Sequence, residues 1–295
     1  MGERFGDIGA VRTGLAATGY LADDAIATSV YLAEALVKPV LVEGPAGTGK
    51  TELAKSVAAM TGARLLRLQC YEGLDESKAL YEWNYRKQLL HLQAGATDAG
   101  GNDLEGDLFG EEFLLTRPLL EAIRATDAVV LLVDEVDRLE VETEALLLEV
   151  LSEYQVSIPE LGTVTATRIP LVFLTSNNTR ELSEALKRRC LYLPLDYPDV
   201  ERERAIVLAR VPGISERLAD QVARVVRSLR ALDLTKPPSV SETLDWARTL
   251  VLLSVDTVDL ERARDTLPLL LKHRSDLVKA TTSLMSGALA AGGID

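Results

Sequence analysis

The stretch Gly44-Pro45-Ala46-Gly47-Thr48-Gly49-Lys50-Thr51 decides how the rest of the chain is interpreted. It has the pattern of a phosphate loop, and it stands between an apolar run at 39–42 and a helical pattern at 52–59, as that loop requires. Its glycines let the main chain turn tightly and present N–H groups to a polyphosphate, beside the positive end of the helix dipole. Lys50 is predicted to reach the β- and γ-phosphates and Thr51 to hold Mg²⁺. A glycine-rich turn without chemical meaning is the alternative, but both flanks favour binding of a nucleoside triphosphate.

A second feature is the continuous apolar run at 128–133, which ends in two carboxylates, Asp134 and Glu135. Such runs are typical of strands buried on both faces of a parallel sheet, and ligands of these folds bind at the carboxyl ends of the strands. Asp134 is predicted to anchor the Mg²⁺ shell. Glu135 is predicted to accept a proton from the attacking water or to polarise it. A strand that ends in a solvated acidic turn is the alternative, which the phosphate loop disfavours.

Further strands are predicted at 63–70, 170–175 and 191–195. The strand at 170–175 ends at Ser176-Asn177-Asn178, where Asn177 could orient the lytic water, although asparagines also commonly form turns. A helix at 179–187 leads to Arg188 and Arg189, which could simply interact with the helix dipole, a contribution of about 0.3–1 kcal/mol.

The region 71–127 is less regular. Helices are predicted at 80–92 and 114–123, and the glycine- and aspartate-rich segment 94–112 is predicted to be a loop. Residues 155–167 resemble a β-hairpin. Beyond residue 198 only helical patterns follow, at 199–210, 214–232, 240–254 and 257–274. The sequence therefore predicts an α/β nucleotide-binding core, residues 1–198, and a smaller all-helical domain, residues 199–295.

Composition narrows the class of protein. The 295 residues carry a net charge of −13, which argues against nonspecific binding to nucleic acid. The two cysteines and two histidines have no metal-binding spacing, and each cysteine is predicted to be a small apolar residue in a reducing compartment. No apolar run is long enough to span a bilayer and no signal segment is visible, so we expect a cytoplasmic protein that does not cross the membrane.

From about residue 10 to about residue 274, these landmarks resemble an AAA+ ATPase of the MoxR group. The resemblance implies a P-loop core with a five-stranded parallel sheet, a helical lid, ATP and Mg²⁺ as ligands, and a homo-oligomeric ring, expected to be a hexamer. It makes Gly44–Thr51 the Walker A motif and Leu131–Glu135 the end of Walker B. It makes Asn177 sensor 1, and Arg189 or its neighbour Arg188 the arginine finger that reaches the next subunit.

The same resemblance makes 155–167 the pre-sensor-1 hairpin and places a helix-2 insertion within 71–127. One departure concerns sensor 2, an arginine in many relatives. Ser241 stands at what we judge to be that position here, and either Arg248 replaces it or the lid senses the γ-phosphate weakly.

Three stretches look like the CoxD-like branch of MoxR proteins: 69–75, 81–85 and 186–192. The resemblance implies a chaperone that matures a client metalloenzyme, a molybdenum hydroxylase such as carbon monoxide dehydrogenase, together with a von Willebrand factor A domain protein. Two alternatives stay open. A nucleic-acid-directed motor on the same core predicts salt-dependent retention of DNA or RNA, and a nucleotide-gated scaffold predicts that Glu135→Gln keeps full biological activity.

Overall fold

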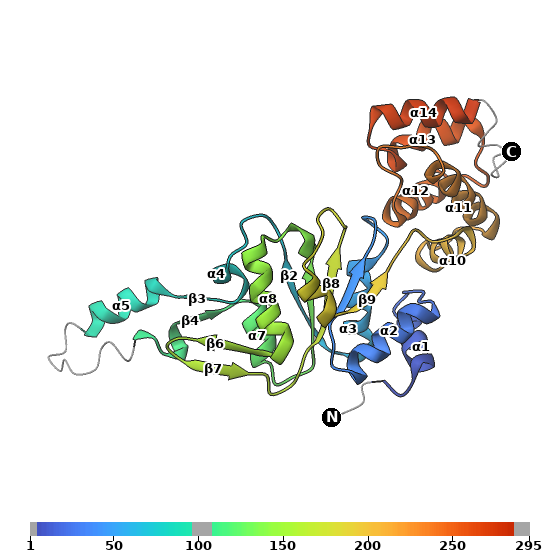
Figure 1. The fold of residues 1–295 in the computed structure, drawn as a ribbon. Helices are drawn as coiled ribbons and strands as arrows, with labels where there is room; N and C mark the ends of the chain where they lie inside the picture. Colours follow the sequence, from blue (N-terminus) through green and yellow to red (C-terminus); the bar gives the residue numbers. More distant parts are fainter. Residues whose placement is uncertain (1–4, 96–107, 286–295) are drawn as a thin grey trace. The chain divides into compact units, whose positions relative to one another are not determined.

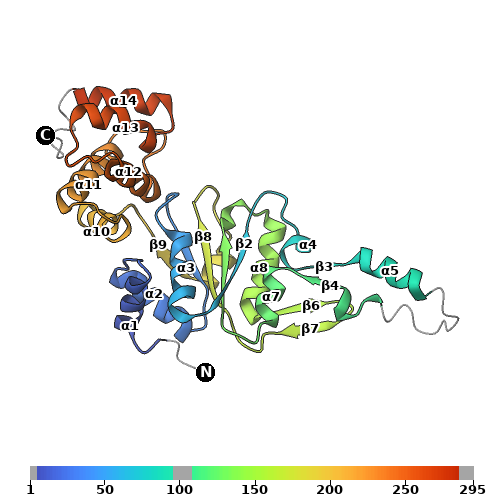
Figure 2. The same ribbon diagram turned by 180° about the vertical axis from the view of Figure 1, so that it is seen from behind.

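A computed structural model of the chain describes residues 5–95 and 108–285 (Figures 1 and 2). The chain divides into two compact units. The first comprises Met1–Thr18, Ala22–Glu43 and Thr51–Pro194, and the second comprises Gly19–Leu21, Gly44–Lys50 and Leu195–Asp295. The boundary near residue 198 between core and lid stays a prediction.

The first unit is built on the predicted five-stranded parallel sheet, whose strand order is β2-β5-β8-β1-β9. Helices cover both of its faces, as the opposite views of Figures 1 and 2 show. The α/β fold class is therefore confirmed. The strands are β1 (Val40–Glu43), β2 (Arg64–Gln69), β5 (Val129–Asp134), β8 (Leu171–Ser176) and β9 (Leu191–Pro194).

Burial in the sheet follows from the order of its strands. Every residue of the central strands β5 and β8 is buried, which explains their nearly unbroken apolar sequences. Strand β2 lies at an edge, so it keeps exposed arginines at positions 64 and 67 within an otherwise apolar run. Because all five strands are parallel, their carboxyl ends meet at one edge of the sheet.

The helices of the first unit pack around this sheet. Helix α7 contacts β2 and β5, whereas α2 contacts β1 and β9. The helices are α1 (Ile8–Ala17), α2 (Asp24–Ala35), α3 (Lys50–Thr61), α4 (Glu76–Ala79), α5 (Tyr85–Gly95), α7 (Pro118–Arg124), α8 (Val141–Glu153) and α9 (Glu184–Arg189), with 3-10 turns η1 (Glu111–Phe113) and η2 (Val136–Arg138).

The helices predicted at 80–92 and 114–123 both begin later than predicted, at Tyr85 and Pro118. Strand β3 (Tyr81–Trp83) pairs antiparallel with β4 (Leu114–Thr116), and the helices begin only after these strands. Local periodicity cannot show a pairing between segments so far apart in sequence. Pro118 opens α7, and a proline disfavours helical backbone in the residue before it. Of the loop predicted at 94–112, residues 96–107 lie outside the described part of the chain.

A second small ribbon pairs β6 (Gln155–Ile158) with β7 (Gly162–Thr165), where the hairpin was predicted. Helix α7 contacts both of these strands and also β4, so the two ribbons are anchored on the same helix.

The second unit contains the helices α10 (Val200–Arg210), α11 (Glu216–Arg230), α12 (Val240–Leu252), α13 (Leu260–Leu270) and α14 (Arg274–Met285). Their apolar faces meet around Trp246, which is fully buried. No helix among residues 5–95 and 108–285 is both long and apolar enough to cross a membrane.

A buried ion pair crosses this core. The guanidinium of Arg230 contacts the carboxylate of Glu203 through both Nη atoms, and its Nε donates to the Pro238 carbonyl at 2.8 Å. The guanidinium also lies 4.4 Å from the centre of the Tyr197 ring. The Thr243 hydroxyl donates to Glu203 at 2.8 Å. These contacts tie α10, α11 and the start of α12 together.

Candidate functional site

The phosphate loop, Gly44 to Gly49, follows β1 and leads directly into α3. The ammonium of Lys50 is buried and donates to the carbonyls of Gly44 at 2.8 Å and Pro45 at 2.7 Å. The Thr48 hydroxyl donates to the Pro45 carbonyl at 3.0 Å, which closes the turn. The ammonium of Lys50 therefore lies inside the turn of the loop, against two of its main-chain carbonyls, at the start of α3.

Gly47 is the tightest point of the loop. Its φ of +75° is unfavourable for residues with a side chain, and a Cβ there would lie 2.3 Å from Cβ of Ser239. Its carbonyl accepts a hydrogen bond from the main-chain N–H of Val240 at 3.1 Å. Ser239 in turn caps α12 in a capping box with Glu242. The loop therefore lies main chain to main chain against the start of α12.

The expected sensor-2 region begins there. Ser241 is exposed in the first turn of α12. Arg248 lies further along the same helix, and its guanidinium pairs with Asp245 at 3.0 Å. The start of α12 meets the loop through Ser239 and Val240, at Gly47.

Asp134 ends β5 and is the centre of a polar cluster in the first unit, although only 2% of it is exposed. Its Oδ1 accepts hydrogen bonds from the hydroxyls of Thr51, at 2.9 Å, and Thr175. Its Oδ2 accepts from Nε of Arg67 at 3.0 Å and from Nη2 of the same guanidinium. Both oxygens of the buried carboxylate therefore have two donors each, as a buried charge requires.

Glu135 follows in a left-handed conformation, with φ of +58°. Its N–H donates to the Thr175 hydroxyl at 2.9 Å, and its carboxylate pairs with Nε of Arg138 at 2.8 Å. Non-glycine residues rarely adopt this conformation, and such positions concentrate at functional sites. The turn leaves the side chain of Glu135 one-third exposed, directly after the buried Asp134.

The donor set of this cluster fits Mg²⁺. A hard cation of this size prefers oxygen ligands, usually one or two carboxylates with water and phosphate oxygens. Asp134 and Thr51 supply a carboxylate and a hydroxyl that already touch each other.

Asn177 immediately follows β8 and is partly buried. The loop after β8 is tied to the turn after β5 through Asp137, whose Oδ2 accepts from the N–H and the hydroxyl of Thr179 at 3.0 and 2.6 Å. Burial alone raises the pKa of Asp137, but hydrogen bonds from Thr179 and from the main chain of Asn177 bring that pKa below its ordinary value. The two segments that carry Asn177 and Glu135 are thereby held side by side.

Arg188 and Arg189 lie in the last turn of α9, and both are exposed. Helix α9 is anchored by the fully buried Leu186 and by Glu144 of α8, which accepts a hydrogen bond from the N–H of Ser183 at 2.8 Å. Arg189 donates to Ser152 and to the carbonyl of Ala185. Within the described residues, neither arginine is paired with a carboxylate.

Sequence reasoning missed two members of the Asp134 cluster, Arg67 and Thr175. Arg67 stands in a predicted strand, where an arginine is normally a solvated edge residue. Thr175 is the last residue of the strand predicted at 170–175, and nothing in the sequence distinguishes it from an ordinary strand threonine. Both cysteines are free thiols, and burial raises the pKa of Cys70 and of Cys190 to about 12.

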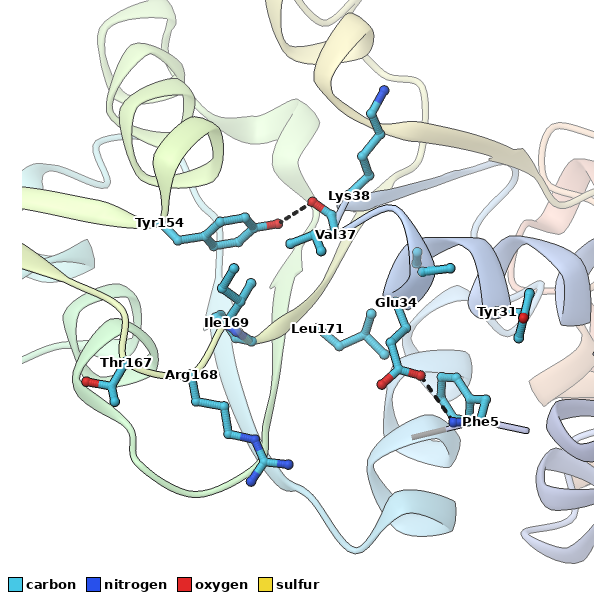
Figure 3. A pocket seen from close by; sticks show the side chains of 13 residues that line it. Phe5, Tyr31, Glu34, Val37, Lys38, Tyr154, Thr167, Arg168, Ile169 and Leu171 are labelled. Carbon is cyan, nitrogen blue, oxygen red and sulfur yellow. Dashed lines mark hydrogen bonds between the residues drawn. The ribbon is translucent and has the colours of Figure 1, made fainter. Parts of the chain in front are cut away.

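A separate pocket of about 610 Å³ lies at the other edge of the sheet, where β1 and β8 begin (Figure 3). Tyr154 and Glu34 line it, and their polar atoms bond to the main chain of Val37 and Phe5. The charged ends of Lys38 and Arg168 point in different directions in Figure 3. The pocket therefore lacks the convergent polar groups that fix a ligand, and it is distinct from the cluster at Asp134.

Comparison with known proteins adds a family match. A model described as the AAA domain of the dynein-related subfamily matches residues 39–190, more than half of the chain. An uncharacterized protein of Staphylococcus haemolyticus is 25% identical over 77% of this chain and 82% of its own length. The gas vesicle ATPase GvpN of Ancylobacter aquaticus is 28% identical over 74% of this chain and 62% of its own length.

Proposed function

Because the chain belongs to the AAA domain family, in its dynein-related subfamily, we propose that it binds ATP with Mg²⁺ and hydrolyses it as a homo-oligomeric ring. The observation that carries this proposal is the hydrogen bond between Thr51 and Asp134, which are 83 residues apart in the chain. It joins the last residue of the loop motif to the first carboxylate of the second motif. The similarity to a relative named as an ATPase supports the same reaction.

In this proposal each residue has one task. Residues Gly44–Thr51 bind the phosphates, with Lys50 on the β- and γ-phosphates. Thr51 and Asp134 hold Mg²⁺, which when bound neutralises developing charge on the phosphates. Glu135 orients and polarises the attacking water.

Two further residues complete the proposed machinery. Asn177 helps to place the attacking water. Arg189, or Arg188, reaches from one subunit into the site of the next, which suits their exposure in the last turn of α9.

We further propose that hydrolysis remodels a partner, as in the MoxR group and its CoxD-like branch. The client would be a molybdenum hydroxylase, and the partner a von Willebrand factor A domain protein. The stretches 69–75, 81–85 and 186–192 support this assignment. It is tested by expressing the chain with such a hydroxylase: an Asp134→Asn variant should leave the client without active cofactor, whereas the parent chain should not.

Steady-state ATP hydrolysis tests the core of the proposal. Glu135→Gln should retain ATP binding but lose turnover. Arg189→Ala should lose on the order of 10³-fold or more in turnover, as expected for an arginine supplied in trans. Lys187→Ala is the matched control, because it removes a cation from the same helical turn and should hydrolyse ATP like the parent.

Mixing the two inactive variants tests the contribution in trans. A subunit with Arg189→Ala keeps its own carboxylates, and a neighbour with Glu135→Gln keeps its arginine, so mixed rings should regain part of the activity. If the single variants hydrolyse ATP like the parent, the assigned mechanism is wrong.

A further inference from the structure

Arg67 is the ionic partner of Asp134. It lies on the edge strand β2, beside β5 in the sheet. Its guanidinium contacts Oδ2 of Asp134 through Nε at 3.0 Å and through Nη2, and it also contacts the side-chain oxygen of Gln69. Both N–H groups reach the same carboxylate oxygen, and hydrogen bonds between two charged groups are stronger than those between neutral groups.

The two sides of this ion pair differ in their surroundings. The Asp134 side chain is 3% exposed, whereas the Arg67 side chain is 46% exposed. Asp134 cannot turn away, because Thr51 and Thr175 hold its Oδ1. Arg67 lies on a sheet edge and can move into solvent without unpacking the core. Arg67 is therefore the member of the pair that can move away and break the ion pair.

We propose that Arg67 is the resident counter-ion of Asp134 and prevents a divalent cation from binding this carboxylate unless nucleotide comes with it. This inference rests on the proposed function, since it concerns the same Mg²⁺ site. Arg67 neutralises the carboxylate and repels a second cation. Phosphate oxygens bound in the loop add negative charge, which offsets that repulsion and admits the metal together with the nucleotide.

The size of the effect follows from ordinary charge–charge interactions. The guanidinium of Arg67 lies within hydrogen-bond distance of Oδ2 of Asp134, so its positive charge acts directly on any cation that approaches the same carboxylate. At this range the interaction of two charges amounts to well over a factor of ten, so removing the charge of Arg67 should strengthen nucleotide-free binding of a divalent cation by about tenfold or more.

Binding of Mn²⁺, followed by electron paramagnetic resonance, tests this on the full chain with and without ADP. The parent should bind Mn²⁺ tightly only with nucleotide. Arg67→Gln should bind nucleotide-free Mn²⁺ at least about tenfold more tightly than the parent, and Arg67→Lys, which keeps the charge, should behave like the parent. Adding Asp134→Asn to Arg67→Gln should abolish the gain, which places the new binding at this carboxylate.

Arg64 provides the matched control. It lies on the same strand, its side chain is 42% exposed, and it pairs with Glu121 and Asp127 instead of Asp134. Arg64→Gln should leave Mn²⁺ binding unchanged. Circular dichroism checks that each variant is folded, and Arg67→Met, which keeps the apolar stem, replaces Arg67→Gln if that variant does not fold.

The inference is overturned if Arg67→Gln and Arg67→Met bind nucleotide-free Mn²⁺ no more tightly than the parent. It is also overturned if the affinity of Arg64→Gln for nucleotide-free Mn²⁺ rises by as much as theirs. Failure of the proposed function has a different signature: the parent would then bind no nucleotide in a fluorescent-nucleotide titration, whatever Arg67 does.

Discussion

Replacing Arg230 by methionine should destabilise the helical unit strongly. Arg230 and Glu203 form a pair whose side chains are only 7% and 1% exposed. Methionine keeps most of the apolar stem but leaves the carboxylate of Glu203 buried without its cation. Removing one partner of a buried pair costs about 3–5 kcal/mol of unfolding free energy.

Arg204→Met is the matched control. Arg204 pairs with Glu216 between the same two helices, α10 and α11, at 2.9 Å, but these side chains are 38% and 81% exposed. Exposed pairs contribute only about 0–1 kcal/mol. Both substitutions remove an arginine that pairs with a glutamate across the same two helices, so the larger loss expected for Arg230→Met reflects the buried position of Arg230 together with its contacts with Pro238 and Tyr197.

The unfolding free energy lost in the Arg230→Met variant should also depend on pH. Burial raises the pKa of Glu203 above its ordinary value, and Arg230 opposes that rise. The folded state therefore holds this proton more tightly than the unfolded chain, and stability falls as pH rises above about 4.5. Without Arg230 the pKa of Glu203 rises further, so the variant should lose more stability at pH 7 than at pH 5.

Urea unfolding at both pH values measures this. The chain has two tryptophans, and Trp246 lies in the core of the helical unit. A Trp83→Phe background makes its fluorescence report on that unit alone. The reasoning is refuted if Arg230→Met costs no more than Arg204→Met, or if its cost is the same at pH 5 and pH 7.

Three further substitutions follow from the same contacts. Gly47→Ala should lower the unfolding free energy by about 2–4 kcal/mol, because φ is positive at this position and the new Cβ overlaps Ser239. It should also weaken the binding of a fluorescent nucleotide, and an unchanged melting temperature and nucleotide affinity would contradict this prediction. Ser239→Ala should lower stability by about 1 kcal/mol in urea unfolding, since it removes a helix cap, whereas an effect within error would show that the cap is replaced. Thr175→Val should lower the unfolding free energy by about 1–3 kcal/mol, because it leaves the N–H of Glu135 without its acceptor. A melting temperature equal to that of the parent would argue against this hydrogen bond.

The fold was predictable where local sequence determines it. The unbroken apolar runs of β5 and β8 reflect burial on both faces, and the phosphate loop carries its own turn and helix start. The starts of α5 and α7 were not predictable, because β3 and β4 form only by pairing with each other across a long insertion.

The candidate site divides in the same way. Glycines, a lysine and paired carboxylates at strand ends have a recognisable pattern, so the residues 44–51, 134 and 135 were named from sequence. Arg67 and Thr175 have no such pattern. Their part in the cluster depends on the neighbours that β2 and β8 acquire in the sheet, which is a property of strand order and not of either strand's sequence.

The hydrogen bond from Val240 to the carbonyl of Gly47 uses only main-chain atoms. Alanine scanning of α12 would therefore pass over it, since every residue except proline carries the same donor. Relatives could exchange all the surface side chains of this helix and still keep the link. Only a change that moves the helix start, or a proline at position 240, would break it.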